Sequence, residues 1–577
     1  MMGRSHWHEL VTVVLATMLA LLSACSSAAT PLPSAQTAED TAISASSRTV
    51  RVGILDAPTV AGGKLVGSGT TGSISPFFSA SLVRADYQQN VIPQLAEAIP
   101  SLEQGSWKML PDNRMETTYR LRPGLTWHDG ASFTAADVVF AWRTIMRPDI
   151  PMTNHTPDDL VETIEAIDPL TVLVRWKELY IYANGYELEP LARHVLDPIL
   201  QRDPQAFVNS SYWNRDWVGL GPYKVIEYEP GSFFRGEAFS DYVLGAPRIK
   251  QIYVYFDLVE TATMVKMLAG ERDVLLSNVL KLETGLSLKA QLEAQGTGTA
   301  VINPDGGARV ANFQFREPFG PPARDVRVRQ GMVFALDRLG LSHAQGDLYP
   351  IMDWFSTSIP SDALLRRGDA YIKKYPYDPA RAAQSFADAG WTRGPDGVLN
   401  TASGERLDIE AQLIESPQDE RETQAFAENL KAAGINTTIR VLPRAQRLSR
   451  DERTKFPGLS FGRAGTAAES YVTKDIPTEE NRWQGSNYGG YSRPEVDRMI
   501  MVFLTTLDPG ERSGRYIELQ KYLTEDLPSI PLHYTPNVLP IRNGLRSVFP
   551  TAPGEGWNSF QVERWFWEKQ PDDPNRS

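Results

Sequence analysis

Cysteine is almost absent from this 577-residue chain. Cys25 is its only cysteine, and it stands at the end of an apolar stretch close to the N-terminus. Everything after Cys25 therefore lacks a thiol. Internal disulfides and thiol catalysis are excluded for the body of the protein.

Histidine is also scarce, and it forms no recognisable metal or catalytic motif. Of the seven histidines, His6 and His8 precede the apolar stretch. The pair His128-Asp129 has no second His or Cys at the spacing of a metal site. No His-Glu-x-x-His segment occurs either. The sequence therefore predicts no catalytic residue, no metal site and no cofactor. A secreted hydrolase that uses paired carboxylates stays open as a competing class.

Positive charge is in deficit, with a formal net charge of −12. Nucleic-acid binding needs clustered Lys and Arg, so the charge argues against a nucleic-acid partner. Hydrophobic residues make up 42% and charged residues 22%, which is ordinary for a globular protein. The length predicts more than one domain.

The N-terminus has the pattern of an export signal. The apolar run from Leu10 to Leu22 is too short to span a bilayer comfortably but suits a signal-peptide core. Leu22 to Cys25 is similar to a bacterial lipobox. It predicts a signal peptide over 1–24 and lipid attachment at Cys25. Residues 25–47, rich in Ser, Ala, Thr and Pro, would be a flexible tether. The alternative is an inert thiol in a discarded signal peptide.

The most informative stretch runs from Tyr119 to Trp142. It predicts a strand over 119–122, a Pro-Gly turn, a return strand over 125–127 and a second turn at 128–130. Thr134 is then expected to cap a helix, with Asp137 completing a capping box. Asp129-Gly130 is best explained as turn chemistry.

This ordered stretch resembles the signature of the family 5 extracellular solute-binding proteins, the dipeptide-, oligopeptide- and nickel-binding components of bacterial ABC importers. Further segments are similar to motifs of that family: Gly219–Tyr223, Val326–Arg338, Tyr377–Trp391 and Asn487–Asp497. The resemblance covers roughly residues 51 to 549.

The resemblance implies an α/β, two-lobed, periplasmic-binding-protein-like fold (type II, cluster C). It places lobe I at 48–304, with an inserted β-rich subdomain at about 94–215. Lobe II would cover 305–536, and 537–577 would return to lobe I. In this fold a ligand lies between the lobes, which close over it by hinge rotation.

The function implied is that of a non-enzymatic, lipid-anchored substrate-binding protein. It would be a monomer outside the cytoplasm, held to the bacterial cell membrane, that captures a peptide or similar solute and delivers it to permease subunits. Three alternatives remain: an oligosaccharide-binding member, a metal-chelate-binding member, and a sensory binding protein that reports to a receptor.

The ligand site is the part of the family pattern from which this sequence departs. Peptide binders of the family carry an acidic residue in a Trp-x-Ala-Asp-Tyr-like stretch, and the matching region, 459–471, lacks that motif. Glu469 could substitute for the missing carboxylate, whereas Arg463 would favour an anionic or hydroxyl-rich ligand. Aromatic stacking faces are expected from the following residues: Phe77, Phe78, Tyr471, Trp483, Tyr488 and Tyr491.

Overall fold

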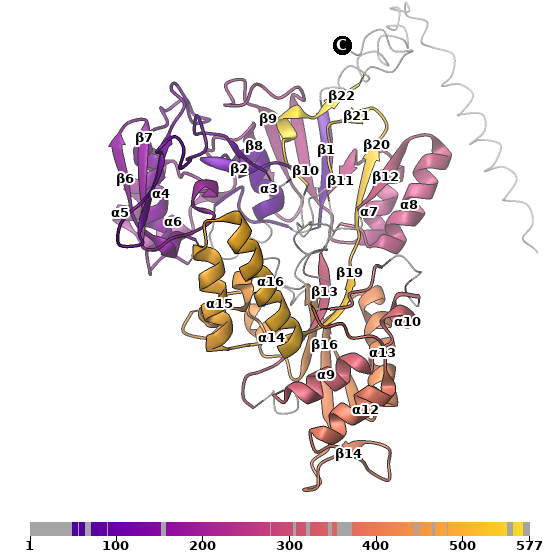
Figure 1. The fold of residues 1–577 in the computed structure, drawn as a ribbon. Helices are drawn as coiled ribbons and strands as arrows, with labels where there is room; N and C mark the ends of the chain where they lie inside the picture. Colours follow the sequence, from indigo (N-terminus) through magenta and orange to yellow (C-terminus); the bar gives the residue numbers. More distant parts are fainter. Residues whose placement is uncertain are drawn as a thin grey trace, which may run out of the picture. The chain divides into compact units, whose positions relative to one another are not determined.

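Three β-sheets form the framework of the fold (Figure 1). The structure is a computed structural model. It describes residues 49–55, 57–63, 71–88, 90–151, 157–276, 279–303, 307–318, 324–343, 345, 349–354, 372–443, 446, 449–463, 468–481, 483–550 and 558–568. Cys25 and the predicted signal peptide and tether lie outside these residues.

The first sheet has seven strands. Their order is β12 (Gly298–Asn303), β20 (Asn537–Arg542), β11 (Val274–Leu275), β1 (Thr49–Ile54), β10 (Gln251–Phe256), β9 (Phe233–Ala238) and β8 (Tyr223–Glu229). Strand β1 is parallel to β10 and β11, whereas β20 is antiparallel to both of its neighbours. The alternating apolar residues Val50 and Val52 are fully buried, as expected from the pattern of this first strand.

The second sheet has five strands. Their order is β17 (Asn436–Leu442), β16 (Asp408–Ile414), β18 (Leu459–Arg463), β13 (Ala308–Phe313) and β19 (Ser529–Tyr534). Strands β16 and β17 are parallel and are joined by helix α13 (Pro417–Ala432). The sequence pattern of residues 407–441 predicts this strand–helix–strand unit, and the unit gives the sheet its α/β character.

The third sheet is antiparallel. Its order is β4 (Trp107–Met109), β5 (Met115–Arg120), β7 (Thr171–Trp176) and β6 (Val161–Asp168). The sequence pattern predicts a hairpin of residues 164–168 with 171–176, and β6 and β7 confirm it. Three short pairs complete the strands: β2 (Val83–Ala85) with β3 (Val91–Pro93), β14 (Thr392–Arg393) with β15 (Leu399–Asn400), and β21 (Leu545–Arg546) with β22 (Phe566–Trp567).

The helices of the first and third sheets come from the first half of the chain. They are α3 (Thr71–Phe78), α4 (Ala135–Ile145), α5 (Arg193–Arg202), α6 (Pro204–Val208), α7 (Glu260–Leu268) and α8 (Leu282–Gln295). Helix α4 packs on β6 and β7, and α8 packs on β12 and β20. In Figure 1, α7 and α8 lie beside the β12–β20 edge of the first sheet.

The remaining helices accompany the second sheet. They are α9 (Val326–Phe334), α10 (Arg338–His343), α12 (Pro379–Asp388), α13, α14 (Arg450–Thr454), α15 (Pro494–Thr505) and α16 (Pro509–Asp526). Helix α9 packs against α12, and α15 packs against α16 (Figure 1). Asp378 caps α12 by accepting a hydrogen bond from the Arg381 backbone N–H at 2.9 Å, and Gly390 follows the helix with φ of 88°. In the sequence, Asp378-Pro379 predicts this helix start and Gly390 predicts this helix end.

The chain crosses twice between the first and second sheets. Strand β12 of the first sheet precedes β13 of the second, and β19 of the second precedes β20 of the first. The same strands pair across the chain, β12 with β20 and β13 with β19, both antiparallel. The chain therefore passes between the two sheets at residues 303–308 and again at 534–537. The domain boundaries expected from the sequence remain a prediction.

The signature stretch folds as predicted in its helix but not in its return strand. Helix α4 begins after Thr134, whose backbone N–H donates to the Asp137 carboxylate at 2.9 Å, as a capping box requires. The predicted strand over 125–127 is wrong. Strand β5 instead pairs with β4 and β7, because after Gly124 (φ 74°) the chain leaves the sheet and makes only an isolated bridge from Thr126 to Ser132.

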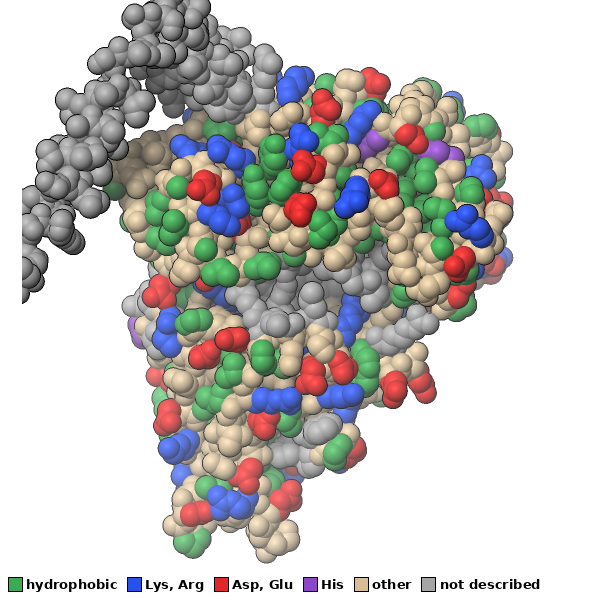
Figure 2. Space-filling model, turned by 180° about the vertical axis from the view of Figure 1, so that it is seen from behind, with side chains coloured by type: hydrophobic (Ala, Val, Ile, Leu, Met, Phe, Trp, Pro, Cys, Tyr) green, Lys and Arg blue, Asp and Glu red, His purple; other side chains and the backbone are tan. Residues whose placement is uncertain are grey.

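Charged side chains of both signs are interspersed over the face shown in Figure 2. Exposed ion pairs among the described residues include Arg440 with Glu452 at 3.1 Å and Arg421 with Glu283 at 2.6 Å. Exposed pairs of this kind stabilise a fold by only about 0–1 kcal/mol each. Positive and negative side chains are therefore mixed on this face, and neither sign dominates it.

Candidate ligand cavity

A cavity of about 530 Å³ lies at the second sheet. It adjoins the C-terminal end of β16 and the first turn of α13, the position where open α/β sheets commonly bind ligands. Its lining residues are Arg309, Asn312, Gln412, Leu413, Ile414, Asp419, Arg453, Ser460, Phe461, Gly462, Ser470, Tyr471, Ser486, Asn487, Tyr488, Gly489, Tyr491, Pro528 and Ser529.

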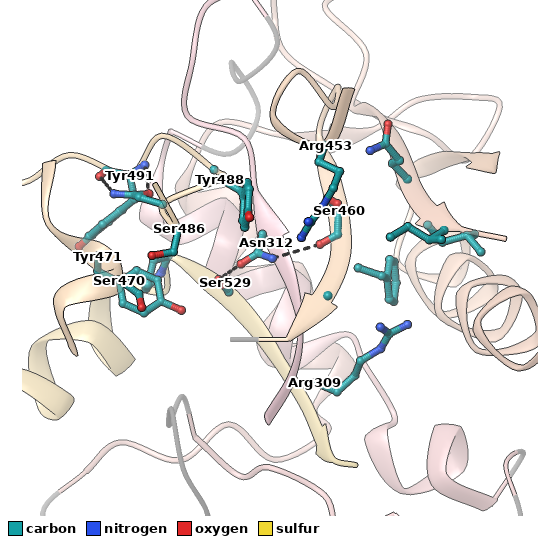
Figure 3. Close-up of a pocket in the computed structure, with 18 of the residues that line it drawn as sticks. Arg309, Asn312, Arg453, Ser460, Ser470, Tyr471, Ser486, Tyr488, Tyr491 and Ser529 are labelled. Carbon is teal, nitrogen blue, oxygen red and sulfur yellow. Dashed lines mark hydrogen bonds between the residues drawn. The ribbon is translucent and has the colours of Figure 1, made fainter. Parts of the chain in front are cut away.

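A row of polar side chains crosses four strands in this cavity. The strand register places Gln412 beside Ser460, Ser460 beside Asn312, and Asn312 beside Ser529. The Ser529 hydroxyl donates to Asn312 Oδ1 at 2.8 Å, and Asn312 Nδ2 donates to the Ser460 carbonyl at 3.4 Å (Figure 3). These contacts fix the amide of Asn312 within the row.

The opposite face of the same strands is apolar. Ala411, Leu459, Ala311 and Ile530 belong to a buried core that also contains residues of α13. Successive strand residues point to opposite faces, so a polar residue between these apolar positions must face the cavity. The hydrophobic core thus fixes the direction of the polar row.

A charged cluster forms one corner of the cavity. Arg309 Nε donates to Glu422 Oε2 at 3.0 Å, and Arg309 Nη2 donates to Asp419 Oδ1 at 3.0 Å. Asp419 also pairs with Lys281 at 3.4 Å, and Glu422 with His533 Nε2 at 2.7 Å. The Nε and Nη2 groups of Arg309 are therefore both bound to carboxylates.

Burial shapes the ionisation of this cluster. Burial alone would raise the pKa of Glu422, but Arg309 and His533 outweigh it and hold that pKa well below its ordinary value. Burial would lower the pKa of Arg309, but the charges of Glu422 and Asp419 raise it instead. Glu422 and Arg309 therefore stay ionised at neutral pH and are paired with each other.

Arg453 presents a different environment. It belongs to α14 and lines the cavity, with its guanidinium carbon 4.6 Å from the ring centroid of Tyr488. Figure 3 shows the two side chains on the same side of the cavity as Ser460. A guanidinium over an aromatic face is attracted by the ring quadrupole and keeps its N–H groups free in its own plane.

The segment from Ser470 to Tyr491 forms the remaining wall. Asn487 holds it closed: its Nδ2 donates to the Tyr491 carbonyl at 2.7 Å, and its Oδ1 accepts from the Tyr491 N–H at 3.0 Å. Gly489 passes so close to β13 that a Cβ there would lie 2.3 Å from the Phe313 carbonyl oxygen. Only glycine allows this approach.

Two of the residues predicted from sequence, Tyr471 and Tyr488, line the cavity, and so does Tyr491. The backbone of Arg463 ends β18 and pairs with Arg309, and Glu469 lies in the 3-10 helix η6 (Ala468–Tyr471), but the side chains of both lie outside the described residues.

Trp483, Phe77 and Phe78 are not part of the cavity lining. Lys455 Nζ lies 4.4 Å from the ring of Trp483. Phe77 and Phe78 have no exposed surface. Phe77 packs edge-on against Trp565 at 6.0 Å, and Phe78 packs against Phe234 at 5.7 Å. Here the expectation of ligand-stacking phenylalanines is corrected, because α3 directs both rings into the core of the first sheet.

The polar row was missed by sequence reasoning. Its signal is a single polar residue inside an otherwise apolar strand, as in Ala411-Gln412-Leu413 and Leu459-Ser460-Phe461. Gly458 to Gly462 also has the Gly-x-Ser-x-Gly spacing of a hydrolase nucleophile elbow. That motif requires a sharp strand-to-helix turn. Ser460 instead lies within β18, and the described part of the cavity lining contains no histidine.

Within the described ranges, no group of three or more His, Cys, Asp or Glu side chains is placed to hold a metal ion. Over the same residues, no helix combines the length and apolar character needed for a membrane crossing.

Residues 90–472 match the family model described as bacterial extracellular solute-binding proteins, family 5 Middle. The chain belongs to this family. Family 5 proteins are the substrate-binding components of ABC transporters and are not enzymes. The recognition made from the sequence motifs is confirmed.

Relatives and solved structures of the family cover most of the chain. The oligopeptide-binding protein AppA of Bacillus subtilis is 24% identical over 503 residues, 85% of this chain and 86% of AppA. An oligopeptide-binding protein from Thermus thermophilus, solved with a pentapeptide, has a TM-score of 0.76 at 23% identity, covering 91% and 98% of the two chains. NikZ from Campylobacter jejuni, solved with Ni(L-His), has a TM-score of 0.75 at 18% identity, covering 90% and 99%. The predicted two-lobed α/β fold is confirmed.

Proposed function

We propose that this family 5 protein captures a peptide or a similar small solute in the cavity at its second sheet and delivers it to the permease of an ABC importer. The observation that carries the proposal is the row Gln412, Ser460, Asn312 and Ser529, which offers hydrogen-bond donors and acceptors along an extended path. An extended peptide backbone needs alternating partners of that kind.

Aromatic residues supply an apolar part of the site. Tyr471, Tyr488 and Tyr491 line the same cavity as the polar row. Tyrosine combines a flat apolar surface with a polar hydroxyl, which suits side chains of varied chemistry. The oligopeptide-binding relatives AppA and the Thermus protein support peptide as the solute class.

We expect no strong selection for a free peptide α-amine. Among the described residues that line the cavity, Asp419 is the single carboxylate, and it already pairs with Arg309 and Lys281. Isothermal calorimetry should compare a short peptide with its N-acetylated form, and the two affinities should agree within a few-fold. A hundredfold loss on acetylation, which is about 2.7 kcal/mol, would show that the amine is recognised. Glu469→Gln would then be the variant to examine.

We further propose that the protein is anchored by lipid at Cys25. The sole cysteine at the end of a lipobox-like sequence supports this. In cells that express Cys25→Ser, the protein should move from the membrane fraction to the soluble extracytoplasmic fraction, because a lost acyl anchor removes most of the membrane affinity. Unchanged membrane retention, with the signal peptide still processed, would contradict the anchor.

Delivery to a permease is tested separately from binding. Deletion of this protein should abolish uptake of a peptide that calorimetry identifies as a ligand, and plasmid-borne wild type should restore it. Intact uptake alongside loss of a transcriptional response to the peptide would instead indicate a sensory role.

A further inference from the structure

Helices α15 and α16 are attached to the second sheet. They lie in the chain between β18 and β19, and the last residue of α16, Asp526, is held by α9. Arg329 of α9 has no exposed surface; its Nε donates to the Asp526 carbonyl at 2.8 Å, and its Nη2 donates to Asp526 Oδ1 at 2.6 Å. Tyr375 donates to the Thr524 carbonyl at 3.0 Å. The two helices and the second sheet therefore form one body.

The connector between β7 and α5, residues 177–192, is held by the first half of the chain. Tyr119 of β5 donates from its hydroxyl to the Ala183 carbonyl at 2.7 Å, and the Leu82 N–H donates to the Leu188 carbonyl at 3.2 Å. The connector therefore belongs to the other body, which contains the first and third sheets.

The connector and α15 meet across the two bodies. The Ile181 N–H donates to the Leu504 carbonyl at 2.9 Å, and Lys474 Nζ pairs with Asp159 Oδ2 at 3.1 Å. Ile181 and Leu504 are each 6% exposed and belong to one contiguous apolar cluster with Tyr180. Figure 1 shows α15 beside the elements of the third sheet. A helix of the second-sheet body is thus packed against the third-sheet region.

The forces in this contact allow it to form and break. The Leu504 carbonyl is among the last four of α15, which have no partner within the helix. Water can serve this carbonyl and the Ile181 N–H when the segments separate, so their hydrogen bond favours neither state strongly. The burial of Ile181 and Leu504 favours contact, because separation would return apolar surface to water. The contact is therefore favourable and reversible.

We propose that the β7–α5 connector and the C-terminal end of α15 form a latch that closes with the two lobes. The chain joins the two bodies at 303–308 and 534–537, and a hinge rotation there moves each body as a unit. Separation of the lobes therefore breaks the contact between Ile181 and Leu504. The third-sheet region carries one half of the latch, and it helps to set how much of the ligand-free protein is closed. This role goes beyond solute capture and does not depend on the chemical class of the solute.

Hydrogen exchange of the ligand-free wild-type protein is the first test. The Ile181 amide should exchange through lobe opening, at a rate that changes little with urea below the unfolding transition, because opening exposes far less surface than unfolding. The amides of β7, which pairs with β5 and β6, should exchange with a steep dependence on urea. If Ile181 shows the same steep dependence as β7, the contact is permanent and the latch is overturned.

A pair of surface variants separates opening of the latch from fraying of α15. Lys474→Gln removes the ion pair with Asp159, so exchange at Ile181 should become about twofold to fivefold faster. Arg498→Gln is the matched control. It removes an ion pair with Glu495 that lies within α15 itself, at 3.0 Å, and should leave exchange at Ile181 unchanged. Equal acceleration in both variants would indicate fraying of the helix and would overturn the latch.

A disulfide across the contact tests whether it moves with the lobes. Ile181→Cys and Leu504→Cys are combined with Cys25→Ser, which leaves these two thiols as the only ones in the chain. A backbone hydrogen bond brings two residues to the Cα separation that a disulfide spans. X-ray scattering without ligand should give the oxidised protein a smaller radius of gyration than the same protein reduced.

The contradictory outcomes of the disulfide experiment are distinct from those of the proposed function. Equal radii of the oxidised and reduced proteins would show that closing the contact does not close the lobes. Failure of the disulfide to form under oxidising conditions would show that the two segments do not meet. Either result overturns the latch. Both are obtained without a solute, so they leave the proposal of peptide capture untouched.

Discussion

At the scale of single residues, His128 belongs to the family-like stretch from Tyr119 to Trp142 and hydrogen-bonds to the backbone of a second family-like segment, Gly219–Tyr223. Its Nδ1 accepts the Gly219 N–H at 3.2 Å, which leaves Nε2–H to donate to the Gly221 carbonyl at 2.9 Å. The two glycines approach Phe78 so closely that a Cβ on Gly219 would lie 2.0 Å from the Phe78 carbonyl oxygen. The imidazole therefore joins two segments that the sequence places about ninety residues apart.

We expect His128 to make stability depend on pH. Burial is the main cause that lowers the pKa of His128 from 6.5 to about 4. Between these values the unfolded chain binds a proton that the folded protein does not, so stability is complete above pH 6.5 and falls as pH drops. The loss should be about 2 kcal/mol between pH 7 and pH 5. Urea denaturation measures it.

The variant His128→Gln should be less stable at pH 7, since both backbone contacts depend on the ring. Its stability should nevertheless change less between pH 7 and pH 5 than that of the wild type. His343→Gln, at an exposed position, should keep the wild-type pH dependence. If the His128 variant keeps that dependence too, another group is responsible.

Predictions for single residues succeeded where residues close in sequence determine the interaction. They failed where distant parts of the chain determine which way a side chain points. The capping role of Thr134 and Asp137 follows from their spacing. The ligand role expected for Phe77 and Phe78 does not hold, because the local sequence does not determine whether the aromatic side of a helix faces the core or the ligand site. Arg309 carries no local signal at all, since its partners Asp419 and Glu422 lie over a hundred residues away.

At the scale of elements, Gly331 is a helix residue whose lack of a side chain is required by the packing of a neighbouring helix. Glycine lowers helix propensity, so the sequence predicts a less stable α9. In the structure α9 packs on α12, and a Cβ on Gly331 would lie 2.6 Å from the fully buried ring of Phe386. The glycine permits this close packing of two helices.

We expect Gly331→Ala to destabilise the protein by about 1–3 kcal/mol, because overpacking outweighs the gain in helix propensity. Gly514 in α16 is a matched control, since a Cβ there would meet nothing within 4 Å. Gly514→Ala should stabilise by about 0.5–1 kcal/mol. Urea denaturation of both variants gives the comparison. A stabilising Gly331→Ala would show that Phe386 moves aside without cost.

Element types were more predictable than element partners. The parallel unit β16–α13–β17 and the hairpin β6–β7 follow from hydrophobic period and turn residues. The strands that pair with β5 and the side of α7 that is buried do not follow from these local patterns. The helical spacing of Ala262, Val265 and Leu268 in the sequence predicts that they share one buried face of α7. Val265 is instead 65% exposed, whereas Thr263 and Met267 are buried. Pairing and burial depend on segments far away in the sequence.

At the scale of the whole molecule, two ion pairs connect the N-terminal end of α8, which packs on the first sheet, with α13, which packs on the second. Lys281 pairs with Asp419 at 3.4 Å, and Glu283 pairs with Arg421 at 2.6 Å. A ligand can favour a closed arrangement of two lobes only by binding it more tightly than the open one. These ion pairs join elements that pack on the first and second sheets, so we expect them to add to the same balance.

We expect a bound peptide to reduce the radius of gyration measured by X-ray scattering.

Replacing Lys281 and Glu283 together by Gln should lower peptide affinity by about three- to tenfold, because exposed pairs contribute about 0.2–1 kcal/mol each. The loss should shrink at high salt. Lys289→Gln, which removes a pair within α8 itself, should leave affinity unchanged. Equal affinity in the double variant would show that the pairs do not act on closure.

The position of β20 has a consequence for the order of folding. This strand comes from residues 537–542, yet it lies between β11 and β12 in the interior of the first sheet, and β19, just before it, forms an edge of the second. Neither large sheet can be completed until the ribosome has made almost the entire chain. Such long-range pairing slows folding. The nascent polypeptide therefore leaves the edges of β11, β12 and β13 that face β20 and β19 unpaired until residues 529–542 have been synthesised.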